Sequence, residues 1–428
     1  MAGHQRQKRR ADIELNKDYL SRLPSEIIEN ILVKLPIKEA VRTSVLSSKC
    51  KSLWTSMPDL VFNEDTTESD LIRIVDKVLK VHQGPIQKFE VEQGRDKHVG
   101  EEVISRWLLV LSKNELKDLR LGFDMHQNCK VPSSLFSYQK LENLEISGCT
   151  ISAPQCFQGL KLLRNLSLCS CELVGITIEK FVLGCPLLER LTLVDVVKDG
   201  CLMIRAPKLK QLVVLEEFTN LLLEAPKLIY ATIYIKYMQT LPVYDGCKSK
   251  LLRAIGGLPN IEELDINSPF CEYLTSGPIP EKLPITFHHL KKILIDLDEK
   301  RKVVDTALCI FQSAPNLKTL HLRTLCLTLP SQNIWEEQRI KQRITSISFL
   351  QQLEVAVILG NMILSEDGES MLAFAKFILS TASQLEKLVV DKWSFNDSVY
   401  GMGFMKKLLS LPRLSSKAVI LVDKAFKY

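Results

Sequence analysis

The sequence predicts an α/β protein in which an N-terminal unit of three helices precedes an irregular solenoid of repeats, with a parallel sheet on the concave face. Two observations carry this prediction. Apolar residues recur at helical spacing between Asp18 and Asp65, and from Leu116 onward one short strand pattern keeps returning, often behind a proline. At 428 residues the chain exceeds a typical single domain, which favours two units or an elongated repeat array.

The N-terminal unit, residues 18–65, begins with the start signals of a helix. Pro24 stands in the first turn, and Glu26 lies near the positive end of the helix dipole. Apolar residues then recur at three- and four-residue steps, at Ile27, Ile28, Ile31, Leu32 and Leu35. Two further short periodic stretches follow and end before Pro58. A unit this small buries too little surface by itself, so we expect it to need a partner surface or to cap the next domain.

The same residues resemble the F-box of plant proteins. The likeness rests on two Leu-Pro pairs, the Ile-Ile-x-x-Ile-Leu helix, the run from Arg42 to Lys49 and Leu53-Trp54, and it departs at Cys50, where the family usually has an aromatic. In that family the unit docks on a Skp-type adaptor, which links it to a cullin ubiquitin ligase. The resemblance implies these adaptor-binding residues: Leu23, Pro24, Ile27, Ile28, Ile31, Leu35, Pro36, Val41, Val45, Leu46 and Trp54.

Composition narrows the class of partner and compartment. A net charge of +6, from 56 basic and 50 acidic residues, demands neither nucleic acid nor an anionic membrane as partner. Twelve cysteines without a CxxC pair are typical of buried thiols in a reducing compartment. Residues 1–17 form a polar, basic tail, which is a solvated disordered segment or a nuclear-import signal. With no apolar stretch long enough to span a bilayer, we expect a soluble cytoplasmic or nuclear protein.

Residues 66–112 are predicted to lead into the solenoid. Ser69 to Val81 has helical periodicity, Phe89 and Val91 alternate with polar residues as in a strand, and Glu101 to Ser112 is helical again. The run HQGPIQKFEV extends the resemblance to one branch of the plant F-box family.

A repeat pattern, apolar-x-x-apolar-x-apolar, organises residues 113–345 and continues beyond them. Its first positions are Leu116, Leu141, Leu163, Leu188, Leu209, Leu228, Ile261, Leu290, Leu317, Leu350 and Leu385. In five of these cases a proline stands two residues earlier, where chance would give about half a case. Several of the prolines end a helical stretch: Ile176 to Leu183, Leu251 to Ile255 and Val303 to Phe311.

Two copies complete the longer leucine-rich-repeat pattern. They are LENLEISGCTI, Leu141 to Ile151, and LRNLSLCSCEL, Leu163 to Leu173, and they place Cys149 and Cys171 at the inward Asn/Cys position. Each repeat should supply one strand to a parallel sheet, with helices or loops on the other face. Between Leu188 and Ile235 the repeats are too short for a helix, so we expect extended backbone on both faces there.

Residues 346–428 differ from the earlier repeats. FLQQLEVAVILG is followed by an acidic turn at Glu366 to Glu369, a helical run from Ser370 to Leu379 and SQLEKLVVDK. This order resembles the FBD domain at the C-terminus of many plant F-box/leucine-rich-repeat proteins. We expect these residues to form the closing repeats, because an array needs an end that covers its last apolar edge.

Catalytic and metal-binding patterns are absent from the sequence. It contains no P-loop, GxGxxG, GxSxG or HExxH motif. Asp296, Asp298 and Glu299 could hold a divalent cation, but a solvated turn is the more frequent meaning of such a run, and Cys169 with Cys171 is more typical of repeat core. We therefore expect no cofactor and no enzymatic activity.

Residues on either side of the middle strand position should point outward from the sheet. These pairs are Asp118 and Arg120, Asn143 and Glu145, Asn165 and Ser167, Arg190 and Thr192, Gln211 and Val213, Tyr230 and Thr232, Glu263 and Asp265, Lys292 and Leu294, and Thr319 and His321. Their chemistry changes between repeats, as on a recognition surface or an inert solvated face. The predicted target-binding residues are Arg190, Tyr230, Glu263, Asp265 and His321.

Taken together, the resemblance and the repeats predict a substrate-recognition subunit of a Skp–cullin–F-box ubiquitin ligase. Its partners would be a Skp-type adaptor, a cullin reached through that adaptor, and a protein target. Two alternatives stay open: an adaptor-bound scaffold without ligase activity, and a hydrolase or transferase whose site is assembled from loops.

Overall fold

A computed structural model of the chain describes residues 23–32, 34–35, 37–43, 53–62, 71–92, 99–124, 129–196, 200–236, 257–274, 283, 285–297, 301–324, 350–360, 369–391 and 399–423. The chain divides into two compact units, Met1–Ile176 (unit 1) and Thr177–Tyr428 (unit 2).

Unit 1 begins with the short helices predicted for the N-terminal unit. These are α3 (Ser25–Leu32), α4 (Ile37–Arg42) and the 3-10 turn η2 (Trp54–Ser56). The carbonyl of Pro24 accepts the amides of Ile27 and Ile28 at 3.0 and 3.2 Å, so the proline starts α3 as expected. Pro36, Val45, Leu46 and Cys50 lie outside the described residues, as does the tail 1–17.

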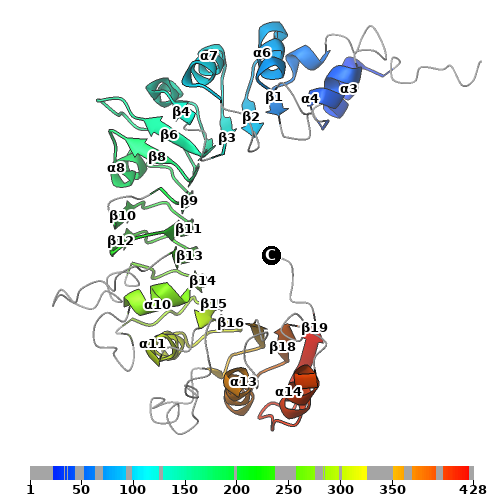
Figure 1. The fold of residues 1–428 in the computed structure, drawn as a ribbon, viewed down its shortest axis with the longest axis vertical. Helices are drawn as coiled ribbons and strands as arrows, with labels where there is room; N and C mark the ends of the chain where they lie inside the picture. The colour runs from blue at the N-terminus through cyan, green and yellow to red at the C-terminus, as the bar shows by residue number, and fades with distance from the viewer. Residues whose placement is uncertain are drawn as a thin grey trace, which may run out of the picture. The chain divides into compact units, whose positions relative to one another are not determined.

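A parallel sheet forms the body of unit 1. Its strands follow in the order β1 (Asp59–Phe62), β2 (Lys88–Glu92), β3 (Asp118–Gly122), β5 (Asn143–Ser147) and β7 (Asn165–Cys169). Helices α6 (Leu71–Val81) and α7 (Glu101–Leu111) connect the first three strands and lie on one side of the sheet (Figure 1). The sheet therefore begins earlier than the repeat pattern indicated.

The first layer of unit 1 is held by aromatic side chains. Phe89 of β2 lies between Phe62 and Trp107, with ring centroids 5.9 and 6.1 Å away. The indole of Trp107 donates to Asp76 of α6 at 2.8 Å, so the buried ring keeps its polar atom paired. This packing joins both predicted helices to the sheet.

A second parallel sheet of unit 1 carries the cysteine positions of the repeats. Its strands are β4 (Cys129–Val131), β6 (Cys149–Ser152) and β8 (Glu172–Val174), and the turn η4 (Ser133–Ser137) follows β4. The buried thiol of Cys171 donates to the carbonyl of Ile146 at 3.2 Å, which confirms the inward placement predicted for Cys149 and Cys171. Burial raises the pKa of the Cys171 thiol to about 11, so it stays protonated and serves as a donor.

Glycine is required where β5 turns into β6. Gly148 has a φ of +70°, and a Cβ at this position would lie 2.0 Å from the carbonyl oxygen of Phe123. Any other residue would therefore clash with the neighbouring repeat.

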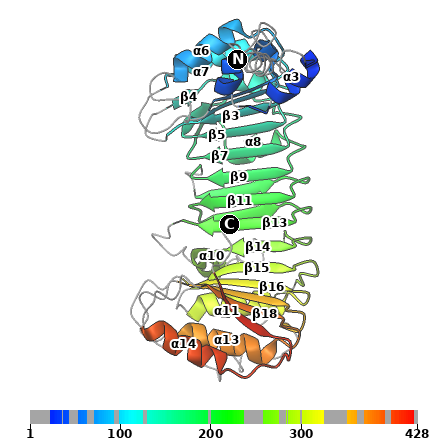
Figure 2. The ribbon, with the colours of Figure 1, turned by 90° about the vertical axis from the view of Figure 1, so that its right-hand side faces the viewer.

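Unit 2 is built on nine parallel strands among its described residues. In order they are β9 (Arg190–Val194), β11 (Gln211–Glu216), β13 (Tyr230–Ile235), β14 (Glu263–Ile266), β15 (Lys292–Leu297), β16 (Thr319–Thr324), β17 (Val355–Gly360), β18 (Lys387–Asp391) and β19 (Val419–Asp423). Figure 2 shows the strands from β9 to β16 side by side.

The helices of unit 2 lie on the other face of its sheet from the face seen in Figure 2. They are α8 (Ile178–Leu183), α10 (Ser268–Leu274), α11 (Arg301–Gln312), α13 (Glu369–Thr381) and α14 (Val399–Leu409). The helical stretches predicted at 176–183, 303–311 and 370–379 are thereby confirmed, whereas 251–255 and the acidic turn 366–368 lie outside the described residues.

The prediction that no helix fits between Leu188 and Ile235 is confirmed for the described residues of this span, 188–196 and 200–235. The short repeats there place two further strands behind the main sheet, β10 (Cys201–Arg205) and β12 (Asn220–Glu224), which pair with each other in parallel. A strand and a tight turn use fewer residues than a helix, which suits repeats of this length.

The phase predicted for the repeat at Leu350 was wrong. The inward positions are Leu353, Ala356 and Ile358, while Val355 lies in register with Thr319 and points outward. The run from Val355 to Leu359 is aliphatic on both faces, so its pattern alone could not fix which side chains face the core.

Within the part of the chain that the structure describes, no helix is long and apolar enough to cross a membrane.

Candidate functional site

Two surfaces carry the residues predicted to bind partners: helix α3 in unit 1 and the outward face of the main sheet in unit 2. We call the second surface the outward sheet face and define it by the side chains of β9 to β19 that point away from the helices.

Helix α3 divides its apolar residues between two directions. Ile27 and Ile31 are 46% and 40% exposed, whereas Ile28 and Leu32 are each 1% exposed. Because Ile27 and Ile31 are four positions apart, they lie on one face of the helix. Ile28 therefore packs inside this chain, and the accessible members of the predicted set centre on Ile27 and Ile31, with Pro24 exposed beside them.

Four other members of the predicted adaptor set are half-buried. Leu23, Leu35 and Val41 fall in this class, as does Trp54 in η2. Their roles in adaptor binding stay predictions. The exposed apolar face of α3, at Ile27 and Ile31, is nevertheless typical of a docking surface.

The first row of the outward sheet face contains Arg190, Gln211, Tyr230 and Glu263 in register on successive strands. Arg190 is exposed at the start of β9, and the hydroxyl of half-buried Tyr230 is 2.8 Å from that of Thr232. Glu263 forms an ion pair with Lys292 of the next strand at 3.5 Å. The structure thus places Tyr230 and Glu263 side by side and Arg190 two strands from Tyr230.

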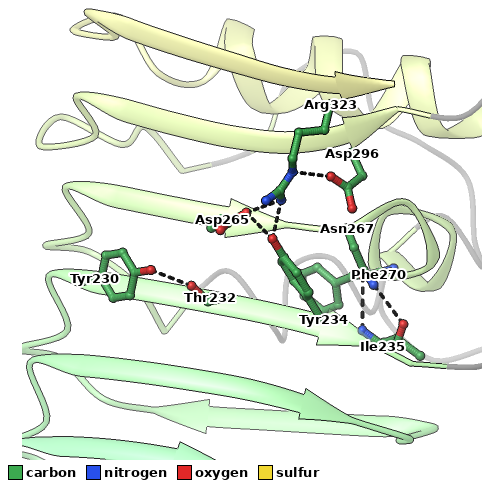
Figure 3. A network of polar contacts seen from close by, with 9 residues as sticks. All are labelled: Tyr230, Thr232, Tyr234, Ile235, Asp265, Asn267, Phe270, Asp296 and Arg323. Carbon is green, nitrogen blue, oxygen red and sulfur yellow. Dashed lines mark hydrogen bonds and ion pairs between the residues drawn. The ribbon is translucent and has the colours of Figure 1, made fainter. Parts of the chain in front are cut away.

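A polar cluster occupies the outward sheet face at β13 to β16 (Figure 3). The Tyr234 hydroxyl donates to Oδ1 of Asp265 at 2.8 Å, and the guanidinium of Arg323 donates to the same oxygen at 2.6 Å. Arg323 also donates to Asp296 at 2.5 Å and to the Tyr234 hydroxyl, and it lies 5.3 Å from the centre of the Tyr234 ring. One arginine thereby joins side chains from four strands.

The cluster is largely removed from water. The side chains of Asp265 and Asp296 are 12% and 10% exposed. Burial raises the pKa of both carboxyls above the usual range of Asp, and the Arg323 guanidinium opposes that shift. For Arg323 burial acts to lower the pKa, but Asp296 and Asp265 outweigh it and keep the guanidinium charged. The two carboxylates therefore depend on this cation.

Sequence reasoning found Asp265 but missed Tyr234 and Arg323. Every second residue of a strand points to the same face. Tyr234 lies two positions after Thr232 on β13, and Arg323 lies two positions after His321 on β16, so both point outward like the predicted pairs. Extending each pair to a third outward residue would have found them. Asp296, considered as a cation ligand, is paired with Arg323 instead, and Asp298 and Glu299 lie outside the described residues.

Asn267 supports the cluster from the end of β14. Its amide oxygen accepts the backbone amide of Ile235 at 3.1 Å, and its nitrogen donates to the Ile235 carbonyl at 2.8 Å. The same oxygen accepts the amide of Phe270 in α10 at 3.1 Å. Asn267 therefore fixes the end of β13, next to Tyr234, against the start of a helix.

His321 lies on the middle outward row and is 9% exposed. Burial, with the charges of Lys292 and Arg323, lowers the pKa of His321 to about 4. The ring is therefore neutral at pH 7, and it offers a target no positive charge. That His321 binds a target stays a prediction. The group that would contact the target is a neutral imidazole.

A pH dependence of stability follows from His321. The unfolded chain binds a proton below about pH 6.5, whereas the folded chain does not until about pH 4. Stability is therefore lost as the pH falls through that window, by about 2 kcal/mol at pH 5. His321→Gln should remove this loss from unfolding free energies measured in urea at pH 7.5, 6 and 5.

The matched control for that experiment is His289→Gln, at an exposed position of the same unit. It should keep the pH dependence of the unchanged protein. Asp265 and Asp296 titrate in all three proteins, so their contribution cancels in the comparison. If His321→Gln loses as much stability between pH 7.5 and pH 5 as the unchanged chain, the neutral buried imidazole is contradicted.

Comparison with known proteins agrees with this architecture. A family described as "FBD-associated F-box protein At5g56370, LRR repeats" matches residues 104–322, and the F-box domain family matches residues 20–62. The fold and these matches define an F-box protein with leucine-rich repeats.

The chain belongs to the F-box/FBD/LRR-repeat family. The Arabidopsis thaliana F-box/FBD/LRR-repeat protein At1g13570 is 32% identical over 426 residues, which cover 94% of this chain and 98% of the relative. F-box/LRR-repeat protein 13 of the same organism is 26% identical over 453 residues, with 95% and 96% covered.

Membership supports an adaptor-type role for this chain. An F-box indicates binding to a Skp-type adaptor, and leucine-rich repeats indicate protein–protein interaction. F-box/LRR proteins are typically non-catalytic adaptors. Among the described residues no group of His, Cys, Asp and Glu is arranged to hold a metal ion.

Proposed function

We propose that this protein is the substrate-recognition subunit of a Skp–cullin–F-box ubiquitin ligase. In this role α3 docks on the adaptor, the outward sheet face of unit 2 holds a protein target, and the cullin-based ligase transfers ubiquitin to that target. Such a subunit would work in the cytoplasm or the nucleus. The observation that carries the proposal is the exposed Ile27 and Ile31 pair on an F-box helix, in one chain with a repeat sheet.

The outward sheet face supports the second half of the proposal. The first two inward positions of each strand from β9 to β15 are aliphatic. The residues of the first outward row, in contrast, change from arginine and glutamine to tyrosine, glutamate and lysine. A fixed scaffold with a varied face is the arrangement repeat proteins use for recognition. The Arg323 cluster gives this face a rigid polar centre, which lowers the ordering cost of binding.

Purification of the full chain from plant cells with its bound partners tests the ligase assignment. If the proposal holds, both a Skp-type adaptor and a cullin should co-purify. Recovery of the adaptor without a cullin would favour the alternative, an adaptor-bound scaffold without ligase activity. Recovery of neither would contradict the docking role itself.

The outward sheet face makes a second test possible. Replacing both Arg190 and Tyr230 with alanine should lower target capture at least tenfold, about 1.4 kcal/mol, because arginine and aromatic side chains carry much of the energy of interfaces. The measurement is quantitative mass spectrometry of proteins captured by a full chain that carries Ile31→Asp, a change expected to uncouple it from the adaptor and so to spare its targets from degradation.

The matched control replaces Lys208 and Lys227 with alanine. Both are exposed in turns of the same unit, outside the outward sheet face. These changes should leave capture intact. Target capture that survives loss of Arg190 and Tyr230 would move the target site to another surface.

A further inference from the structure

The C-terminal end of unit 2 exposes an unusual number of aliphatic side chains. Five of the thirteen large hydrophobic side chains that are exposed among the described residues fall between residues 409 and 422. They are Leu409, Leu414, Val419, Leu421 and Val422, with exposed fractions from 36% to 57%. We call this set the terminal edge. A repeat array normally ends in a polar cap, so an aliphatic end marks a surface that something covers.

Strand β19 is the last strand of the sheet, and only β18 pairs with it among the described residues. The amide of Val419 donates to the Glu386 carbonyl at 2.9 Å, so Val419 and Leu421 direct their backbone groups toward β18. Backbone groups alternate along a parallel strand, and those of Ile420 and Val422 therefore point away from the sheet. Strand β19 contains no lysine, proline or glycine, and its one charged residue, Asp423, stands at its end. The run from Val419 to Val422 therefore lacks the residues that usually block edge pairing.

The charge of this end is strongly positive. Between residues 399 and 423 the sequence contains four basic residues, Lys406, Lys407, Arg413 and Lys417, against one acidic residue, Asp423. Lys406, Lys407 and Lys417 are exposed, and no ion pair joins them to another residue in the described part of the chain. Arg413 is fixed by a hydrogen bond to the carbonyl of Ala418 at 2.7 Å, directly before β19. An unpaired strand edge, aliphatic side chains and unpaired cations thus coincide in the last repeat.

We propose that the terminal edge binds an extended segment of a partner protein that carries alternating acidic and aliphatic residues, which adds to β19 as a further strand. Main-chain hydrogen bonds to Ile420 and Val422 would hold the segment, and its aliphatic side chains would cover Val419 and Leu421. Its carboxylates would face the lysines. This interaction is separate from both α3 and the outward sheet face target site.

Charge decides between this occupant and a second copy of the chain. Two copies meeting at β19 would bring Lys406, Lys407 and Lys417 of each chain toward the same cations of the other. Like charges in one interface oppose association. An acidic partner instead gains from the same groups, so the charge of the edge favours a different protein.

The test uses the full chain and three synthetic peptides whose binding is followed by fluorescence anisotropy. The first peptide alternates aspartate or glutamate with valine or isoleucine over eight residues. The second has lysine at each acidic position, and the third is the acidic peptide with alternate backbone amides N-methylated. The acidic peptide should bind at least tenfold more tightly than either of the others, because only it offers both the charge and the strand edge.

Two variants locate the binding on the chain. Val422→Pro removes an amide that points away from β18 and leaves the ladder to β18 intact, and Lys406→Glu with Lys417→Glu reverses the charge of the edge. Each of these two variants should bind the acidic peptide at least tenfold more weakly than the unchanged chain. Lys208→Glu with Lys227→Glu, the same charge change elsewhere in unit 2, should not.

Several results would overturn the proposal. If the lysine peptide or the N-methylated peptide binds as tightly as the acidic peptide, strand addition by an acidic segment is excluded. The same conclusion follows if Val422→Pro leaves the affinity for the acidic peptide unchanged. Self-association lost in Val422→Pro would assign the edge to a second copy, and binding confined to phosphatidylserine vesicles would assign it to a membrane. Adaptor binding depends on α3 and not on β19. Co-purification of the adaptor with the same variants therefore tests the proposed function separately from the terminal edge.

Discussion

Ile31→Asp should abolish co-purification of the Skp-type adaptor while the protein stays folded. Ile31 is 40% exposed and lies one turn from Ile27 on α3, so a charge there reaches solvent in the free chain. In the complex, the same carboxylate would be buried against an apolar surface without a partner, which costs several kcal/mol. The change also removes an aliphatic side chain whose burial contributes about 1.5 to 3 kcal/mol. Together these two free-energy costs correspond to more than a hundredfold loss of affinity for the adaptor.

A matched control separates docking from folding. Val81→Asp makes the same kind of change at an exposed aliphatic residue of α6, in the same unit but on another helix. Val81→Asp should leave adaptor binding unchanged, and both variants should show the circular dichroism and melting temperature of the unchanged protein. Undiminished adaptor binding by a folded Ile31→Asp chain would remove α3 from the docking surface.

The periodic elements were predictable because their signals are local. Prolines placed two residues before the first apolar position of a repeat, and aliphatic residues at fixed spacing, located the main-sheet strands from β3 to β16 and the alternation of their side chains. The absence of a helix between Leu188 and Ile235 followed from repeat length alone. These features depend on spacing along the chain, which the sequence displays directly.

Features that depend on neighbouring strands were missed. Strands β1 and β19 lie outside the repeat pattern, and each is recognised only by its pairing with β2 or β18. At β17 the aliphatic run Val355 to Leu359 left the phase undetermined, since register across the sheet fixes which face is buried.

The Arg323 cluster shows the same limit at the level of the site. Tyr234, Asp265 and Arg323 are separated by 31 and 58 residues in the sequence, and only the register of four strands brings them together. Asp265 appeared in the sequence as half of an acidic pair with Glu263. In the structure the two residues have different partners, Arg323 and Lys292, so proximity in sequence did not indicate a shared role.

Arg323→Leu should destabilise unit 2 by about 3 to 5 kcal/mol, because it leaves two buried carboxylates without their cation. Arg323 pairs with Asp265 at 2.6 Å and Asp296 at 2.5 Å, and burial already raises the pKa of both acids. The measurement is the free energy of unfolding in urea at pH 7.5. Arg190→Leu, at an exposed arginine of the same sheet face, is the matched control and should change stability by less than about 0.5 kcal/mol.

The sign of the pH dependence gives a further signature of the same defect. Without Arg323 the folded-state pKa of Asp265 and Asp296 should rise further above the value in the unfolded chain, so the folded state binds more protons. The loss of stability relative to the unchanged protein should therefore shrink as the pH falls toward 5. Adding Asp265→Asn and Asp296→Asn to Arg323→Leu should restore much of the loss at pH 7.5, because the buried charges are then gone. If Arg323→Leu unfolds like Arg190→Leu, or if the two asparagines give no rescue, the carboxylates are solvated by water and the cluster does not stabilise the sheet.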